Sequence, residues 1–262
     1  MAIKAAIFDM DGVVHRGENA IPGAAQAIRA LEKAGMKVFF MTNNSARSRK
    51  DYAAKLARFG IRAGEGAIYT SALGAAKWAA RKGAKSAYVI GEAGLEYELR
   101  LAGIKSVKGA GVDAVMVGLD RNLSYEKIDM AMQAISKGAL FIATNPDHIY
   151  PRENDFGPGA GVMVAAVQAA SGKEPDYIAG KPTTHMIEDL LADWKIKKSE
   201  AVFIGDRLDT DIRCANAAGV KSVLVLTGVA TQQDAMEAKK GERPDMVLKS
   251  IAELEPAALA RL

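Results

Sequence analysis

The sequence of 262 residues has one cysteine, Cys214, and no long apolar run. One cysteine cannot form a disulfide within the chain, which excludes the disulfide-stabilised secreted class and is typical of a reducing compartment. The apolar runs are far shorter than the ~18 residues of a membrane-spanning helix. An apolar strand begins directly after the N-terminus and leaves no room for a signal peptide. We therefore expect a cytoplasmic protein without a membrane partner.

The sequence also lacks any block of like charge, although its net charge is +4. Acidic and basic residues are interspersed, so we expect no nucleic-acid partner. The three histidines are too far apart in the sequence to form a recognisable zinc set. Hydrophobic residues make up 49% and charged residues 25%, which is an ordinary globular balance. The length lies near the size at which one core divides into two domains. The oligomeric state stays open, a homo-oligomer included.

Apolar strands alternate with amphipathic helices along the chain, which predicts βαβ units and a parallel sheet. Proline at a helix start and glycine after its end mark the boundaries of several helices. The predicted strands span residues 3–8, 37–41, 87–90, 112–117, 139–143, 201–204 and 223–226. The predicted helices span residues 22–35, 48–59, 71–83, 92–102, 124–137 and 211–218, with a last helix opening at a capping box over residues 250–253.

Four polar motifs stand out, and three of them directly follow an apolar strand. They are Asp9-Met10-Asp11-Gly12, Thr42-Asn43-Asn44-Ser45, Gly180-Lys181-Pro182 and the segment 205–211, Gly-Asp-Arg-Leu-Asp-Thr-Asp. In a parallel sheet the carboxyl ends of the strands share one edge, which is where ligands bind. Each motif alone has a simpler interpretation, such as a turn, a helix cap or a surface lysine. Their joint order favours one site.

The residue types of these motifs suit phosphoryl transfer. A carboxylate can attack phosphorus to form an aspartyl phosphate, which divides one difficult step into two. Mg²⁺ prefers carboxylate, carbonyl and water oxygens. Hydroxyl, amide and lysine donors can hold the non-bridging phosphate oxygens. The sequence therefore predicts a metal-assisted site with a carboxylate nucleophile.

The four motifs resemble those of the haloacid dehalogenase-like superfamily of aspartate-nucleophile phosphatases. The resemblance is closer to its NagD-type branch, which includes the p-nitrophenyl-phosphatase-like proteins, and it covers essentially the whole chain. Further segments that look like this branch are residues 70–72, 144–147, 158–161 and 226–229. The resemblance implies an α/β fold in which an α/β cap domain is inserted into a Rossmann-like parallel-sheet core domain.

The resemblance also implies roles by position. Asp9 would be the nucleophile and a Mg²⁺ ligand, and Asp206 would complete the metal site. Asp11 would protonate the leaving oxygen and later activate water, while its backbone carbonyl binds Mg²⁺. Asp211 would orient a metal-bound water or Lys181.

Other residues would bind the phosphoryl group or support the site. Thr42, Asn43 and Lys181 would hold the phosphoryl oxygens, and Arg207 would approach the substrate. Ser45, which closes the second motif, would lie behind these residues.

The spacing of the motifs predicts where a second domain is inserted. Ser45 and Lys181 are 136 positions apart, far more than one or two βα units need. We expect residues 1–83 and 178–262 to form the catalytic core and residues 84–177 the cap, which would close over the site and exclude water. The loop 144–161 is the candidate for contacting the leaving group, with Asn145 foremost. The alternative is that Asn145-Pro146-Asp147 is only a turn.

The leading hypothesis is a Mg²⁺-dependent phosphomonoesterase that hydrolyses a small phosphorylated metabolite through an aspartyl phosphate on Asp9. A phosphotransferase or mutase of the same superfamily is the runner-up, although no insertion follows Asp11 as in the familiar mutases. Dehalogenase chemistry is disfavoured because it does not need Asp11 as a proton donor. A phosphoacceptor switch of the response-regulator type has its motifs in another order. The sequence does not choose among small phosphate esters.

Overall fold

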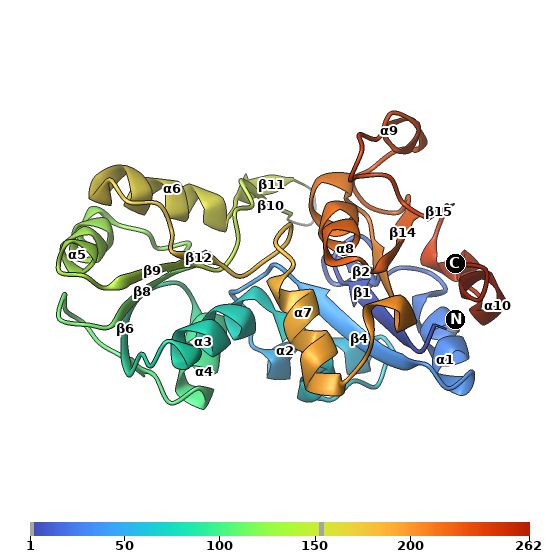
Figure 1. Ribbon diagram of the computed structural model, residues 1–262, viewed down its shortest axis with the longest axis horizontal. Coiled ribbons are helices and arrows are strands. Elements are labelled where there is room, and N and C mark those ends of the chain that lie inside the picture. The colour runs from blue at the N-terminus through green and yellow to red at the C-terminus, as the bar shows by residue number, and fades with distance from the viewer. Residues whose placement is uncertain (1–2, 152–154) are drawn as a thin grey trace. The chain divides into compact units, whose positions relative to one another are not determined.

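In the computed structural model, which describes residues 3–151 and 155–262, the chain forms two compact units (Figure 1). The first unit comprises the chain up to Thr42, Tyr52–Tyr69 and Lys181–Leu262. The second unit comprises Asn43–Asp51 and Thr70–Gly180, so it is inserted into the sequence of the first. Within the described residues, no helix combines the length and the apolar character needed to cross a bilayer.

The first unit is built on a six-stranded sheet with the strand order β15-β14-β13-β1-β4-β5. Its central strands are apolar and fully buried, as expected for strands covered on both faces. The pairings of β1 with β4 and β13, and of β14 with β13 and β15, are parallel. The strands are β1 (Ala5–Asp9), β4 (Lys37–Thr42), β5 (Ile68–Thr70), β13 (Ala201–Gly205), β14 (Lys221–Val225) and β15 (Met246–Leu248).

Alternate residues of these strands pack against helices. Phe8 and Phe40 form one core with Leu31 of α1 and Leu56 of α2. The helices of this part of the chain are α1 (Ala24–Lys33), α2 (Arg49–Arg58), α7 (His185–Trp194), α8 (Arg213–Ala218), α9 (Gln232–Met236) and α10 (Pro256–Leu259), with 3₁₀ turns at Glu65–Ala67, Lys198–Glu200 and Ile251–Glu253. A short hairpin, β2 (His15–Arg16) with β3 (Asn19–Ala20), follows β1.

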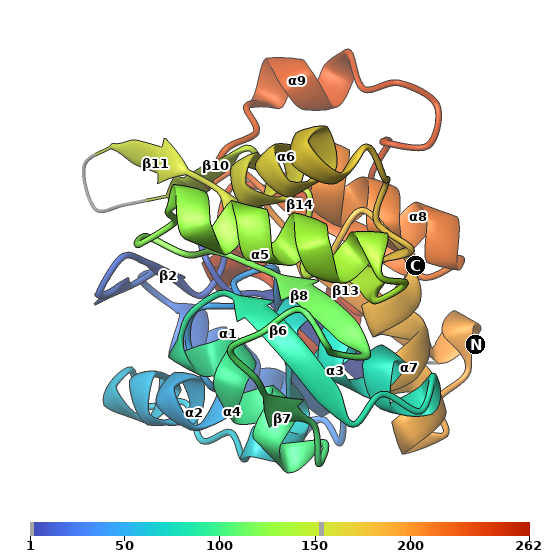
Figure 2. The ribbon, with the colours of Figure 1, turned by 90° about the vertical axis from the view of Figure 1, so that its left-hand side faces the viewer.

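The second unit has its own parallel sheet, with the strand order β12-β9-β8-β6-β7. Figure 2 shows α5 and α6 over one face of this sheet and α3 and α4 beneath the other. Val115 and Val117 pack towards α5 and α6, whereas Ala114 and Met116 pack towards α3 and α4. The elements are β6 (Ser86–Ile90), β7 (Lys105–Ser106), β8 (Ala114–Val117), β9 (Leu140–Ala143), β12 (Tyr177–Ile178), α3 (Ser71–Arg81), α4 (Ala93–Leu101), α5 (Tyr125–Ser136) and α6 (Ala160–Ser171).

The two parallel sheets confirm the predicted α/β class with a Rossmann-like core and an inserted α/β domain. The second compact unit includes α3 and also Asn43–Asp51, and the extent of the cap, residues 84–177, stays a prediction. Ala72, Ala75 and Ala79 of α3 are buried in one cluster with Leu95 and Leu99 of α4. Their small side chains allow α3 to lie close to its partner helix.

Two expectations differ from the structure. The segment 144–161 is not one open loop, because β10 (Ile149–Pro151) pairs antiparallel with β11 (Phe156–Pro158); residues 152–154 of that segment lie outside the described residues. The predicted last helix is interrupted: a 3₁₀ turn over Ile251–Glu253 is followed, after a break, by the short helix α10 (Pro256–Leu259). Glu253 accepts a hydrogen bond from the Lys249 amide, and Pro256 disfavours a helical conformation in the residue before it.

Candidate active site

The candidate site lies at the carboxyl edge of the first unit's sheet. Asp9 ends β1, and Asp206 follows the last residue of the neighbouring strand β13. On the other side of β1, Met41 of β4 lies opposite Asp9, so Thr42 reaches the same edge one residue later. The parallel register thus places Asp9, Thr42 and Asp206 at one edge, as the sequence predicts.

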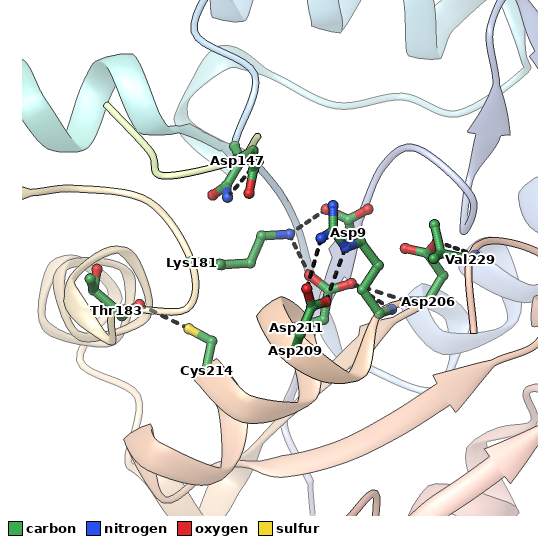
Figure 3. Close-up of polar contacts among 11 residues, drawn as sticks. Asp9, Asp147, Lys181, Thr183, Asp206, Asp209, Asp211, Cys214 and Val229 are labelled. Atoms are coloured by element: carbon green, nitrogen blue, oxygen red, sulfur yellow. Dashed lines mark hydrogen bonds and ion pairs between the residues drawn. The ribbon is translucent and has the colours of Figure 1, made fainter. Parts of the chain in front are cut away.

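Three carboxylates gather at this edge around one lysine (Figure 3). Asp9, Asp206 and Asp211 are buried, and each offers an oxygen within 4.8 Å of the others. The Lys181 Nζ donates to the Asp9 carboxylate, and it lies 2.6 Å from Oδ1 of Asp211. Lys181 is only 2% exposed, so its ammonium contacts groups inside the site, namely these carboxylates and any ligand bound next to them.

Asp211 is held from two sides. Its Oδ1 accepts from Lys181, and its Oδ2 accepts from the backbone amides of Asp206 and Arg207, each at 3.1 Å. A π-helical turn over Leu208–Ile212 leads into α8, so helical structure begins three residues before the predicted Asp211. Both oxygens of Asp211 therefore already bind donors, which suits a residue that positions Lys181 and the Asp206 backbone.

Asp206 lies in a tight backbone pocket. Its Oδ2 accepts from the Val229 amide at 2.8 Å, and a β-carbon at Gly12 or Gly228 would overlap the carboxylate. Gly12 also has a φ of +82°, which L-residues rarely adopt. The Thr227 hydroxyl donates to the Gly12 carbonyl at 2.7 Å and ties the two loops together.

The buried cluster contains three carboxyl groups and one ammonium group. Burial raises the pKa of Asp9 to about 7; the Lys181 ammonium opposes this rise and the Asp211 carboxylate adds to it. Burial also raises the pKa of Asp206 well above its ordinary value, with the charges of Asp211 and Asp9 adding to the effect. For Lys181, burial alone would lower the pKa, but the carboxylates of Asp211 and Asp9 raise it overall. One ammonium does not balance three carboxylates, so a further cation fits this site.

Asp11 is placed differently from the three clustered carboxylates. Its side chain is 33% exposed, and its Oδ1 lies 3.2 Å from Nδ1 of the buried His15. The loop is closed by backbone hydrogen bonds from Gly12 to His15 and from His15 to Met10. Asp11 thus keeps an accessible carboxyl group next to the edge where Asp9 lies.

The remaining predicted residues of the second motif lie in the second unit. The Asn145 Nδ2 donates to the Asn43 carbonyl at 2.6 Å, and its Oδ1 accepts from the Asp147 amide at 3.1 Å. The Asn43 Nδ2 donates to the Asp147 carboxylate at 3.0 Å. Asn145 therefore fixes the backbone of Asn43, and a direct contact of Asn145 with substrate stays a prediction.

Two further predicted residues have protein partners. Ser45 is buried in the second unit, where its Oγ accepts from the Leu119 amide at 3.2 Å. The Arg207 guanidinium binds the Asp209 carboxylate at 3.1 and 2.9 Å. The substrate contact predicted for Arg207 would compete with this ion pair.

Sequence reasoning assigned no role to Gly228, Val229 or Lys55. The segment Leu226-Thr227-Gly228-Val229 resembles the NagD-type branch, and its glycine was the available signal. Lys55 lies on α2, far from any motif, and its buried Nζ is 3.4 Å from Nδ1 of His15. Nothing in the local sequence indicates that contact.

The chain is similar to known hydrolases over most of its length. A family profile described as haloacid dehalogenase-like hydrolase matches residues 6–105, and one described as HAD-hydrolase-like matches residues 178–254. The chain is 38% identical to human glycerol-3-phosphate phosphatase over 96% of this chain and 89% of that protein. It is 34% identical to the ribonucleotide monophosphatase NagD of Escherichia coli K12 over 97% of this chain and 99% of that protein.

Solved structures with the same fold extend the comparison. The p-nitrophenyl phosphatase from Archaeoglobus fulgidus superposes with a TM-score of 0.91 at 32% identity, over 98% of this chain and 100% of that one. The glycerol phosphate phosphatase from Mycobacterium tuberculosis in complex with magnesium superposes with a TM-score of 0.90 at 34% identity, over 98% of this chain and 79% of that one. The chain therefore belongs to the haloacid dehalogenase-like hydrolases, as a phosphatase of the NagD and p-nitrophenyl phosphatase-like branch.

Proposed function

We propose that this protein is a Mg²⁺-dependent phosphomonoesterase that acts on a small phosphorylated metabolite through an aspartyl phosphate on Asp9. The observation that carries the proposal is the contact between the Asp9 carboxylate and the buried Lys181 ammonium at the carboxyl edge of the sheet. A carboxylate nucleophile needs a nearby cation to accept the negative phosphoryl group, and Lys181 supplies one.

Mg²⁺ is the cation proposed for the acidic cluster. The side chains of Asp9 and Asp206 and the backbone carbonyl of Asp11 would hold it, since hard oxygen ligands suit this ion. The surplus of buried carboxylates over ammonium groups supports a divalent cation there. When bound, Mg²⁺ supplies positive charge that offsets the repulsion between the carboxylates and a phosphate ester.

The first chemical step forms the aspartyl phosphate. An Asp9 carboxylate oxygen forms a bond to phosphorus while the bond from phosphorus to the ester oxygen breaks. Asp11, in its protonated form, gives its proton to the departing oxygen, and the alcohol leaves. The accessible side chain of Asp11 supports this assignment, because a general acid must reach the leaving group.

The second step releases phosphate and restores the enzyme. Asp11, now a carboxylate, takes a proton from water while the water oxygen bonds to phosphorus and the bond from phosphorus to Asp9 breaks. Lys181 and Thr42 would hold phosphoryl oxygens through both steps, and so would the Asn43 amide. Asp211 would keep Lys181 in place through the 2.6 Å contact.

The substrate class proposed is a small phosphate monoester. The relatives named above are a glycerol-3-phosphate phosphatase, a ribonucleotide monophosphatase and a p-nitrophenyl phosphatase. We assign substrate selection to the inserted second unit, which would act as a cap. Within this unit, the segment 144–147 is the first candidate for contacting the leaving group.

The test is a phosphate-release screen over a panel of metabolites with and without Mg²⁺, using Asp9→Asn as the control. We expect Mg²⁺-dependent release by the natural chain and none by Asp9→Asn, with the folded state retained. Acid-quenched protein should carry one phosphoryl group on the peptide that contains Asp9. Normal turnover by Asp9→Asn would refute the mechanism.

The same screen distinguishes hydrolysis from the runner-up reaction, phosphoryl transfer to an alcohol. A phosphotransferase would pass the phosphoryl group from Asp9 to an added alcohol and release little free phosphate. Phosphorylated alcohol as the main product, with water present in excess, would replace the hydrolase proposal.

A further inference from the structure

His15 is fully buried beside Asp11 and takes no part in the reaction described above. Its Nδ1 lies 3.2 Å from Oδ1 of Asp11 and 3.4 Å from the Nζ of Lys55. Its Nε2 is buried and has no hydrogen-bond partner among the residues that the structure describes. All polar contacts of this ring are therefore made through Nδ1, next to the carboxyl group of Asp11.

The ring is fixed by several independent contacts. The His15 backbone is hydrogen-bonded to Gly12 and Met10 within the turn that carries Asp11. The ring centroid lies 5.9 Å from that of Phe59. A side chain held this firmly can impose one orientation on a flexible neighbour.

Asp11, in contrast, has few restraints of its own. Its side chain is 33% exposed, and among the residues that the structure describes His15 is the only side chain in polar contact with it. The clustered carboxylates of Asp9, Asp206 and Asp211 instead share Lys181 and backbone amides. Within the part of the chain that the structure describes, His15 is thus the side chain placed to orient the Asp11 carboxyl group.

We propose that His15 is a positioning residue that holds the Asp11 carboxyl group, through Nδ1, in the orientation from which it protonates the leaving oxygen. This inference rests on the proposed role of Asp11. A buried histidine kept only for packing would need neither nitrogen near Asp11. Burying Nε2 without a partner is costly, so the Nδ1 contact is the feature that explains a histidine here.

Three substitutions separate positioning from packing. His15→Asn keeps a polar atom at the place of Nδ1 but loses volume. His15→Gln puts its polar atoms at the place of Nε2, where none of the described residues offers a partner, and His15→Phe keeps the ring without either nitrogen. Positioning predicts that only Asn retains function, whereas packing predicts that Phe is the best replacement. Urea unfolding of each variant confirms that it is folded.

The readout is kcat/KM for two kinds of substrate, because kcat/KM reports only steps up to departure of the leaving group. An alkyl phosphate such as glycerol phosphate needs a proton from Asp11, whereas p-nitrophenolate leaves readily without one. For His15→Phe and His15→Gln we expect roughly a 10- to 100-fold loss with the alkyl phosphate and little change with p-nitrophenyl phosphate. His15→Asn should stay near the natural chain with both.

Equal losses with both substrates, or better function in His15→Phe than in His15→Asn, would overturn the proposal. Failure of the proposed function is a different result. In that case the natural chain would release no phosphate from any ester, or Asp9→Asn would retain full turnover. A third result would reject only the role of His15. In it, Asp9→Asn loses turnover as proposed, but the His15 variants show the same ratio of kcat/KM between the two substrates as the natural chain.

Discussion

Gly228 lies so close to the Asp206 carboxylate that a β-carbon at position 228 would overlap its oxygen and its carboxyl carbon. The next residue, Val229, donates its backbone amide to the same carboxylate at 2.8 Å. The Gly228 backbone has no positive φ, so available space and not backbone conformation requires glycine here. This contact fixes the direction in which Asp206 presents its free oxygen.

Gly228→Ala should therefore move Asp206 and weaken the proposed metal site. We expect roughly a 10- to 100-fold rise in the Mg²⁺ concentration for half-maximal activity, the range found when groups that orient metal ligands are altered. Overpacking should also cost about 1–3 kcal/mol in the free energy of unfolding. Gly66→Ala is the matched control, because a β-carbon there has open space and no unusual φ. Equal behaviour of the two variants would contradict the role of Gly228.

Substitutions of Asp211 should separate its charge from its role as an acceptor. Asp211→Asn keeps an oxygen that can accept from the amides of Asp206 and Arg207, whereas Asp211→Ala leaves the buried Asp206 amide and the part-buried Arg207 amide without that partner. An unsatisfied buried group costs about 1–3 kcal/mol, so the Ala variant should be less stable than the Asn variant by at least about 1 kcal/mol. Urea unfolding measures this difference. Both variants should lose turnover, since each removes the charge that holds Lys181. Equal stabilities would mean that water replaces the carboxylate.

The raised pKa of Asp9 should make the metal-free protein less stable as the pH rises. Asp9 binds its proton more tightly in the folded state, with a pKa of about 7, than in the unfolded chain, with a pKa of 3.8. Its stabilising contribution is complete below pH 3.8 and is lost as the pH rises through about 7. In chelator, the free energy of unfolding should fall between about pH 5 and about pH 8, and fall less in Asp9→Asn.

Added Mg²⁺ should reverse this loss most strongly at the higher pH. The ion binds deprotonated carboxylates, so its stabilisation of the folded state grows as Asp9 and Asp206 lose their protons. Unfolding in urea with and without Mg²⁺, at both pH values, measures the effect. A stabilisation by Mg²⁺ that is the same at both pH values would show that these carboxylates do not bind it.

The residues that gather at the edge of the sheet could be predicted from the sequence, because the carboxyl ends of parallel strands lie at the same edge. Asp9, Thr42 and Asp206 each stand at the end of a buried strand or just after it, and parallel register brings them together. Lys181 follows no predicted strand, so its place in the site is predicted only by the joint order of the four motifs and by the family resemblance. The sequence gives the position of each residue along the chain, and the parallel pairing of the strands brings these positions close together in space.

Other features depend on partners that are distant in the sequence. The helix α3 reads as one more helix of the core, and its membership of the inserted unit depends on the packing of its alanines against α4. The amide of Asn145 could face substrate or backbone, and only the position of the Asn43 carbonyl decides between them. The contact between Lys55 and His15 joins residues 40 positions apart and has no local signal.

The single cysteine should be unreactive in the folded protein. Burial raises the pKa of the Cys214 thiol to about 12, and its Sγ lies 3.0 Å from the Thr183 carbonyl. At about pH 8 the thiolate fraction is then about 10⁻⁴, whereas a free thiol is roughly a quarter ionised. We expect a coloured disulfide reagent to react about 1,000-fold more slowly with the folded protein than with the protein in urea, and to leave phosphatase activity unchanged. Reaction of the folded protein at the rate of free cysteine would mean that α8 opens readily. Loss of activity on the same timescale would couple this opening to Asp211, which lies in the π-helical turn that leads into α8.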